Sequence, residues 1–331
     1  MESRQFRVWK DGEYTYPAAF GFVPGFRTYL HEDGETRPGV LVIPGGGYRM
    51  VVPSEGEVVA RRFMELGYQC FVGTYTTNMG GLATLGLQPL RDISRLVRFI
   101  RSRAEEFRLD PTRLVVCGFS AGGHLCGSLC VHWQDVEDPD PALARFSNRP
   151  DGAILSYPVI TAGPHAHRDS FVSLLGADAG AEELEYMSLE TQVTRDTPPI
   201  FLWQTVTDEL VPVENTYLMA EALLKAGVSF EHHVFPRGPH GLSVSNDAWE
   251  RADFGEPYPM EQLYRLADAV RDGRAQVSPE VRAGLEMFAH PDPERASAWV
   301  HKALPEVAVW PELADRWMRG PMLEAARGQQ G

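Results

Sequence analysis

LVVCGFSAGGH, residues 114–124, is the most informative stretch of the sequence. Its first four residues form a short apolar run, which is typical of a buried parallel strand. The pattern G-x-S-x-G follows from Gly118 to Gly122, and a helix is predicted to continue through about Trp133. A turn of this kind between a strand and a helix holds a serine in a strained conformation, with its hydroxyl exposed above the sheet. We therefore expect Ser120 to be a nucleophile.

Strands and helices are predicted to alternate along much of the chain on both sides of this stretch. Helical spacing of apolar residues predicts helices near residues 90–107 and over residues 214–226. Residues 1–34 are expected to supply antiparallel edge strands. The short apolar or β-rich runs predicted as strands are residues 39–43, 70–72, 114–117, 153–156, 200–203 and 230–235. The alternation predicts an α/β fold with a mostly parallel central sheet and helices on both faces.

Two segments interrupt the alternation and shape the predicted domain organisation. Residues 160–197 are expected to form a small cap near the active site, and residues 246–305 an insertion of unknown role. Residues 1–245 together with 306–331 would then form the main domain. Trp310 and Trp317, in a strongly amphipathic terminal helix, are predicted to anchor that helix to the sheet.

The net charge of −14 disfavours nonspecific binding to nucleic acid or to an anionic membrane surface. No run of apolar residues reaches the length of a transmembrane helix, so we expect no membrane association. The N-terminal residues lack the apolar run of a signal peptide, which predicts a cytoplasmic protein. The sequence leaves the oligomeric state open, a homo-oligomer included.

Neither cysteines nor arginines indicate a special site. The four cysteines are expected to be buried thiols, and because no further ligands lie at short spacing, we predict neither a metal nor a cofactor. The predicted helix near residues 90–107 and its end carry Arg91, Arg95, Arg98, Arg101 and Arg108. Since acidic residues lie beside them, they are predicted to form a solvated face of the helix.

A serine hydroxyl needs a base to become nucleophilic at neutral pH. His240 lies in a loop directly after the predicted strand 230–235, and we expect it to be the general base. Asp208 follows the predicted strand 200–203, so its carboxylate would lie beside His240 and orient it. Glu209 and Glu214 remain alternatives for this acid.

The glycines at 45–47 directly follow the predicted strand 39–43. Catalysis of acyl transfer requires backbone N–H groups aimed at one point, without side chains in the way. We expect the amides of Gly46, Gly47 and Ala121 to form an oxyanion hole. Elsewhere, His165 and His167 form an H-x-H pair in the cap region, and His124 is expected to pack or to form hydrogen bonds locally.

The chain resembles the carbohydrate acetylesterase branch of the α/β-hydrolases, which includes the acetyl xylan esterases. The resemblance covers roughly residues 30–245 and the terminal helix, and Pro44 stands where lipase-type relatives carry histidine. The matching stretches are residues 37–48 (RPGVLVIPGGGY), 109–124 (LDPTRLVVCGFSAGGH), 167–176 (HRDSFVSLLG), 197–212 (TPPIFLWQTVTDELVP) and 231–242 (EHHVFPRGPHGL).

This resemblance implies an α/β-hydrolase fold, a triad of Ser120, Asp208 and His240, and hydrolysis of small acyl esters, acetyl above all, on a sugar or short oligosaccharide. Tyr48 and His167 are predicted to contact the substrate, Tyr48 by stacking on a sugar ring. The triad alone would equally serve a broad small-acyl esterase or an arylformamidase-like amidase. A binding protein without activity that has kept the fold is a further alternative.

Overall fold

The computed structural model describes residues 3–289, 302–320 and 322. Within these residues, eight strands form one sheet in the order β1-β2-β4-β3-β5-β6-β7-β8. β1 and β2 run antiparallel to their neighbours, and all other neighbouring strands are parallel. The strands are β1 Gln5–Arg7, β2 Gly25–Tyr29, β3 Arg37–Ile43, β4 Gln69–Gly73, β5 Leu109–Phe119, β6 Gly152–Ser156, β7 Ile200–Thr205 and β8 Phe230–Phe235.

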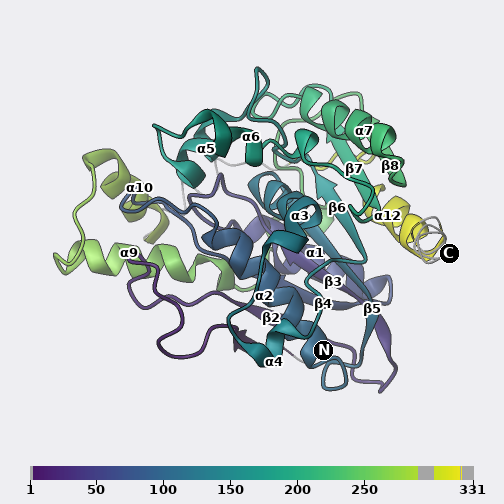
Figure 1. The fold of residues 1–331 in the computed structure, drawn as a ribbon, viewed down its shortest axis with the longest axis horizontal. Coiled ribbons are helices and arrows are strands. Elements are labelled where there is room, and N and C mark those ends of the chain that lie inside the picture. Colours follow the sequence, from purple (N-terminus) through teal and green to yellow (C-terminus); the bar gives the residue numbers. More distant parts are fainter. Residues whose placement is uncertain (1–2, 290–301, 321, 323–331) are drawn as a thin grey trace.

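Helices pack on both faces of this sheet (Figure 1). The α-helices are α1 Glu57–Glu65, α2 Gln88–Ser102, α3 Ala121–His132, α4 Pro141–Ala144, α5 Arg168–Leu175, α6 Ala181–Tyr186, α7 Glu214–Ala226, α8 Asp247–Glu250, α9 Glu261–Arg271, α10 Pro279–Ala289 and α12 Trp310–Arg319. Short 3-10 helices are η1 Pro53–Glu55, η2 Trp133–Asp135, η3 Leu189–Thr191 and η4 Tyr258–Met260.

Two apolar layers hold the sheet between the helices. Alternate residues of β3 separate the layers: Leu41 and Ile43 join α2, α3 and α7, whereas Val40 and Val42 join α1 and α12. This alternation follows from strand geometry, because successive side chains point to opposite faces. The predicted mostly parallel α/β sheet is confirmed, as are the antiparallel edge strands from residues 1–34.

The C-terminal helix α12 docks on the sheet as predicted. Trp310 is fully buried, stacks on Trp203 with ring centroids 5.3 Å apart, and donates from Nε1 to the carbonyl oxygen of Ser243. Trp317 lies against Phe201 with ring centroids 5.8 Å apart. This hydrogen bond connects α12 to the candidate site, because Ser243 lies only three residues after His240.

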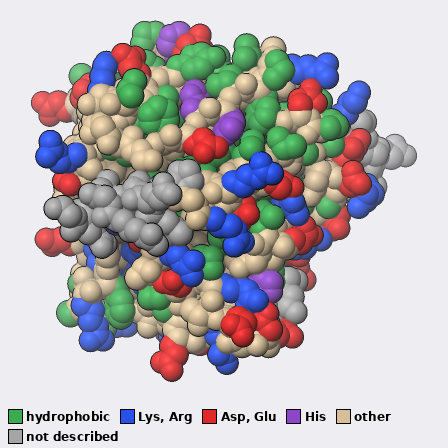
Figure 2. Space-filling view, turned by 90° about the vertical axis from the view of Figure 1, so that its right-hand side faces the viewer, with side chains coloured by type: hydrophobic (Ala, Val, Ile, Leu, Met, Phe, Trp, Pro, Cys, Tyr) green, Lys and Arg blue, Asp and Glu red, His purple; other side chains and the backbone are tan. Residues whose placement is uncertain are grey.

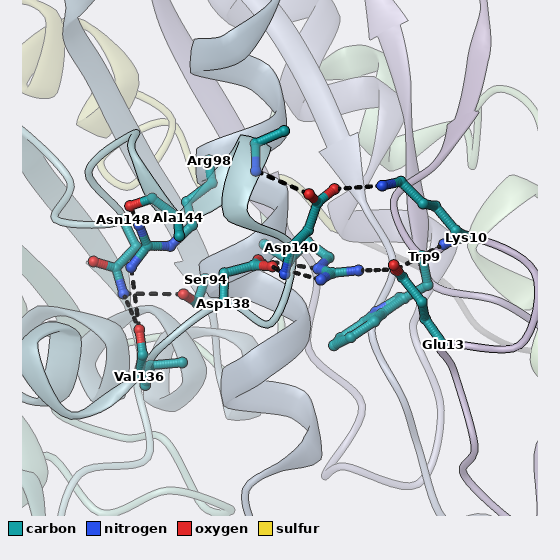
Figure 3. A network of polar contacts seen from close by, with 12 residues as sticks. Trp9, Lys10, Glu13, Ser94, Arg98, Val136, Asp138, Asp140, Ala144 and Asn148 are labelled. Atoms are coloured by element: carbon teal, nitrogen blue, oxygen red, sulfur yellow. Dashed lines mark hydrogen bonds and ion pairs between the residues drawn. The ribbon is translucent and has the colours of Figure 1, made fainter.

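The prediction of a solvated arginine face is wrong for three of the five arginines. Arg91 and Arg108 are exposed, but Arg95, Arg98 and Arg101 are buried. Arg95 binds Glu13 and Asp138. Arg98 donates to backbone carbonyls, among them that of Ala144 (Figure 3). Carboxylates far away in the sequence bind Arg95 and Arg101, and distant backbone carbonyls bind Arg98, which the local pattern around the helix cannot indicate.

Residues 160–197 and the described part of residues 246–305 contain the elements that the sequence analysis placed in a cap and an insertion. α5, α6 and η3 belong to the first, and α8, η4, α9 and α10 to the second. Gln262 of α9 is tied to the loop after β4: its Oε1 accepts from the N–H of Thr77 at 2.8 Å, and its Nε2 donates to the Thr77 carbonyl at 2.8 Å. The predicted domain boundaries stay a prediction, and residues 290–301 lie outside the described part of the chain.

All four cysteines are buried free thiols, as expected. No helix among the described residues is long and apolar enough to cross a membrane. On the face seen in Figure 2, lysine and arginine side chains are interspersed with aspartate and glutamate rather than gathered into one patch.

Candidate active site

Ser120 lies on the turn between β5 and α3, in a conformation that L-residues rarely adopt. Its φ is 51° and its ψ is −119°, and its N–H donates to the carbonyl of Ser156 on β6. A β carbon on Gly118 would stand 2.3 Å from the carbonyl oxygen of Gly122, and one on Gly122 would stand 2.2 Å from that of Ile43. The two glycines of the motif are therefore required by close backbone contacts, and the strained turn that the motif predicts is present.

The structure brings Ser120, His240 and Asp208 into one hydrogen-bonded series. His240 Nε2 lies 2.9 Å from Ser120 Oγ, and His240 Nδ1 lies 2.7 Å from Asp208 Oδ2. The Asp208 side chain is 1% exposed and that of His240 is 12% exposed. A proton on Nδ1 fits both contacts, because Nδ1 then donates to the carboxylate and Nε2 accepts from the hydroxyl.

The backbone after β7 fixes the carboxylate of Asp208. Its Oδ1 accepts from the N–H of Leu210 at 3.0 Å and from that of Val211 at 2.9 Å. The alternatives for the acid lie elsewhere: Glu209 is exposed, and Glu214 has its carboxylate 4.0 Å from His165. Asp208 is thus the carboxylate that contacts His240.

The loop of three glycines after β3, residues 45–47, lies directly against the nucleophile and is called the glycine loop below. Gly46 and Gly47 have φ values of 124° and 63°, which favour glycine. Among the described residues, no acceptor is found for the amide N–H groups of Gly46 and Gly47. Ala121 is the first residue of α3, so its N–H has no partner within the helix. Donors without partners beside a nucleophile are what an oxyanion hole requires, although the role of these three amides stays a prediction.

The prediction that Tyr48 stacks on a sugar ring is not supported by its position. Tyr48 is 1% exposed, and its hydroxyl lies 2.7 Å from Nδ1 of the buried His124. His124 Nε2 lies 2.8 Å from the Met187 carbonyl, and burial lowers the pKa of His124 to about 4. The neutral His124 therefore accepts from Tyr48 and donates to Met187. Tyr48 ties the glycine loop to α3, and its ring has no face left for a substrate.

His167 lies near the catalytic pair, whereas His165 is half exposed beside Glu214. His167 Nδ1 is 2.8 Å from Ser170 Oγ at the start of α5. Burial lowers the pKa of His167, and the nearby His240 lowers it further. Its predicted contact with substrate stays a prediction. No cluster of three or more His, Cys, Asp or Glu that could hold a metal is found among the described residues.

Two residues of the site were missed by the sequence analysis: Glu55 and Tyr157. Glu55 is 4% exposed and accepts hydrogen bonds from the N–H of Gly45 and from the hydroxyl of Tyr157. Tyr157 follows β6 directly, at the sheet edge that carries Ser120 and Asp208, and this position was a usable signal. No signal in the sequence indicated Glu55, because it lies in a short polar segment that is typical of an exposed turn.

The parallel sheet, the strained serine after β5 and the acid and base after β7 and β8 define an α/β-hydrolase. The BD-FAE family model matches residues 28–223. The chain belongs to the BD-FAE family, in the acetyl xylan esterase-like branch of the α/β-hydrolases.

Two curated relatives are similar over most of this chain. It is 51% identical over 269 residues to endo-1,4-β-xylanase B of Butyrivibrio fibrisolvens, a match that covers 81% of this chain and 42% of that protein. It is 27% identical over 254 residues to an acetylxylan esterase of Xylanibacter ruminicola, covering 71% of this chain and 49% of the relative. The chain therefore spans less than half the length of either relative.

Solved structures agree with the fold. The acetyl ester-xyloside bifunctional hydrolase of Caldicellulosiruptor lactoaceticus is 33% identical, with a TM-score of 0.69 over 82% of this chain and 97% of that one. The carboxylesterase Cest-2923 of Lactobacillus plantarum is 21% identical, with a TM-score of 0.67 over 96% of this chain and 97% of the other, and this likeness concerns the fold alone.

Proposed function

We propose that this chain is a serine esterase that removes small acyl groups, acetyl above all, from esters of sugars or xylo-oligosaccharides. The observation that carries the proposal is the series Ser120–His240–Asp208, with contacts of 2.9 and 2.7 Å, beside amide donors for which no acceptor is found in the described part of the chain. The acetylxylan esterase and the acetyl ester-xyloside hydrolase among its relatives support the substrate class.

The reaction proceeds in two steps through an acyl-enzyme. His240 takes the proton of Ser120 as the serine oxygen attacks the ester carbonyl, and Asp208 stabilises the imidazolium that forms. The negative charge on the carbonyl oxygen is held by the amides of Gly46, Gly47 and Ala121. Loss of one such donor costs about 3 kcal/mol of transition-state stabilisation in comparable enzymes. His240 returns the proton to the leaving alcohol, and water then cleaves the acyl-enzyme by the same route. The reaction uses no metal or cofactor.

His167 is proposed to contact the alcohol part of the substrate. It lies near His240, which protonates the leaving alcohol, and Ser170 fixes its orientation through a bond of 2.8 Å. His167→Ala is then expected to raise KM several-fold for acetylated xylo-oligosaccharides and to leave KM for p-nitrophenyl acetate nearly unchanged. His165→Ala, two residues away and half exposed, is the matched control. Equal effects of His167→Ala on both esters would argue against this contact.

The test is hydrolysis of p-nitrophenyl acetate, butyrate and octanoate, with acetylated xylo-oligosaccharides alongside. Ser120→Ala is compared with Ser102→Ala, a serine of α2 whose hydroxyl donates to the Phe99 carbonyl. We expect the wild type and Ser102→Ala to be fastest on acetate and active on the sugar esters, and Ser120→Ala to be inactive. Activity of Ser120→Ala at the wild-type rate would refute the proposal.

Two further outcomes would redirect the assignment. Serine-dependent activity on the p-nitrophenyl esters alone would leave a broad small-acyl esterase or an arylformamidase-like amidase, and N-formylkynurenine separates these two. A wild type inactive on all esters would be treated with a fluorophosphonate probe, which labels an activated serine. Failure to label Ser120 would favour a binding protein without activity.

A further inference from the structure

Glu55 is a buried carboxylate behind the nucleophile that the reaction described above does not use. It ends η1, the short helix between the glycine loop and α1, and it is 4% exposed. Its Oε2 accepts from the N–H of Gly45 at 2.7 Å, and its Oε1 accepts from the hydroxyl of Tyr157 at 2.7 Å. A buried carboxylate is costly unless it is hydrogen-bonded, and here both oxygens are.

Through Gly45, Glu55 sets the position of the glycine loop. A β carbon on Gly45 would stand 2.9 Å from Cβ of Ser120 and 3.0 Å from Oε2 of Glu55, so the glycine is enclosed between the two side chains. The bond from its N–H to Glu55 fixes the peptide that leads directly to Gly46 and Gly47. A displacement of Glu55 would therefore displace the proposed oxyanion donors relative to Ser120.

Through Tyr157, the same carboxylate reaches the base. The Tyr157 ring packs edge-on against the imidazole of His240, with centroids 4.9 Å apart. Its hydroxyl also accepts from the N–H of Ser243, in the loop that carries His240, at 3.0 Å. Glu55 thus contacts both sides of the reacting centre, with one oxygen for each.

The donors around Glu55 match an ionised carboxylate. The Gly45 N–H can only donate, and the Tyr157 oxygen already accepts from Ser243, which leaves its proton for Glu55. The pKa of Glu55 is raised, because burial outweighs the lowering by these two bonds and by the charge of His240.

Few other charged groups lie close enough to alter the interaction between the carboxylate of Glu55 and the imidazolium of His240. Tyr75 and Cys117 also face Glu55, but burial raises the pKa of each well above its usual value, so both stay neutral. His240 itself is faced by Asp208, by Glu55, by the Tyr157 ring and by His167, whose own pKa is lowered. The imidazolium of His240 is therefore the positive charge that forms beside Glu55 during acyl transfer.

We propose that Glu55 is a positioning residue that holds the glycine loop directly and His240 through Tyr157, and that its negative charge stabilises the imidazolium of His240. This proposal rests on the esterase function proposed above. It assigns two carboxylates to one base: Asp208 binds Nδ1, and Glu55 acts through Tyr157 and through its field.

The experiment measures kcat, KM and the pH dependence of kcat/KM on p-nitrophenyl acetate for the wild type, Glu55→Gln and Tyr157→Phe. Glu55→Gln keeps an acceptor for Gly45 but removes the charge, which disfavours the imidazolium. We expect kcat to fall roughly tenfold with KM nearly unchanged. The acid limb of the profile, where kcat/KM falls at low pH because the base is protonated, is expected to lie about half a pH unit lower than in the wild type. Tyr157→Phe keeps the charge, so we expect kcat to fall severalfold with a smaller movement of the limb.

The matched control is Asp92→Asn. Asp92 is a fully buried carboxylate of α2 that accepts from Thr76 and Trp9 and has no contact with the triad. Asp92→Asn is expected to lower the melting temperature and to leave the acid limb at its wild-type pH. A limb that moves equally in both variants would show a general effect of lost buried charge and would overturn the proposal.

An acid limb that stays at the wild-type pH in folded Glu55→Gln would also overturn the proposal. Should Glu55→Gln not fold, Tyr157→Phe decides: a lower kcat at unchanged KM supports the proposal, and a wild-type kcat refutes it. The rate of fluorophosphonate labelling of Ser120 against pH repeats the test without an ester substrate. An enzyme that hydrolyses no ester but shows the shifted labelling profile would therefore separate failure of the esterase proposal from failure of this one.

Discussion

Gly45 lies so close to Ser120 that a β carbon on Gly45 would stand 2.9 Å from the β carbon of the serine. The same atom would stand 2.6 Å from the carbonyl oxygen of Phe119, which is backbone and cannot rotate away. The glycine loop and the nucleophile turn are therefore in direct contact, and the position of one fixes that of the other.

Gly45→Ala is expected to remove most of the activity without unfolding the protein. The new methyl group must push the glycine loop away from the serine turn, which moves the amides of Gly46 and Gly47 from the carbonyl oxygen of the substrate. Because loss of one donor costs about 3 kcal/mol, we expect kcat to fall by a factor of roughly 100 or more. Kinetics on p-nitrophenyl acetate, together with the melting temperature, measure both effects.

Gly180→Ala is the control for this substitution. Gly180 precedes α6 with a φ of −72°, which alanine adopts, and its added β carbon would meet nothing closer than 3.7 Å. Near wild-type kcat in Gly180→Ala and Gly45→Ala alike would contradict the tight contact at Ser120.

The buried Arg95 of α2 should contribute strongly to stability. It pairs with Glu13 and with Asp138, which is 3% exposed, and its guanidinium lies 3.9 Å from the Trp9 ring centre. Arg95→Met would leave a buried carboxylate without its cation, so we expect the free energy of unfolding to fall by about 3 kcal/mol. Urea denaturation of Arg95→Met and of Arg91→Met, an exposed arginine on the same helix, measures the difference. A comparable loss in both variants would assign the effect to the helix and not to the ion pair.

The sequence predicted the regular elements well because their patterns are local. Helix α7 and strand β8 have the predicted bounds, residues 214–226 and 230–235. The arginines of α2 were misjudged because their partners Glu13, Asp138 and Asp151 lie far away along the chain. A helical pattern indicates which face is polar, but whether that face meets solvent or buried carboxylates depends on tertiary packing.

In the candidate site, too, residues with a local pattern were predicted, and residues whose role depends on tertiary contacts were not. Ser120, His240 and Asp208 were predicted from the ends of strands, because parallel strands bring their carboxyl ends to one edge of a sheet. Tyr48 was misjudged, since an aromatic residue after a glycine loop is equally compatible with a stacking platform and with a buried strut to His124. Glu55 could not be found, because neither its burial nor its bonds to Gly45 and Tyr157 leave a local pattern.

His124 should make the protein less stable in acid. Burial lowers its pKa from 6.5 to about 4, so between these pH values the unfolded chain binds more protons at this residue than the folded one. Stability is therefore lost as the pH falls from 6.5 towards 4, by about 2–3 kcal/mol at pH 4.5.

Free energies of unfolding at pH 7 and pH 4.5, for the wild type and His124→Gln, test this expectation. The variant has no group that titrates at this position, so it should lose about 2–3 kcal/mol less than the wild type over that interval. Other buried histidines, such as His132, are the same in both proteins and cancel in the difference. Equal losses would mean that His124 is protonated in the folded protein, in conflict with its bond from the Tyr48 hydroxyl.

Asp208→Asn should abolish catalysis by reversing the tautomer of His240. The N–H groups of Leu210 and Val211 both point at Oδ1, so the asparagine oxygen is expected to take that place and its NH₂ group to face His240. Nδ1 must then accept, the proton moves to Nε2, and Nε2 can no longer take the proton of Ser120. A wrong tautomer of this kind lowers kcat by about 10⁴ in a serine protease, and we expect a loss of similar size on p-nitrophenyl acetate with little change in melting temperature. The matched control is Glu209→Gln, which changes the neighbouring, exposed carboxylate and should keep wild-type kcat. A large loss in Glu209→Gln with an active Asp208→Asn would instead require the loop after β7 to rearrange so that Glu209 orients the base.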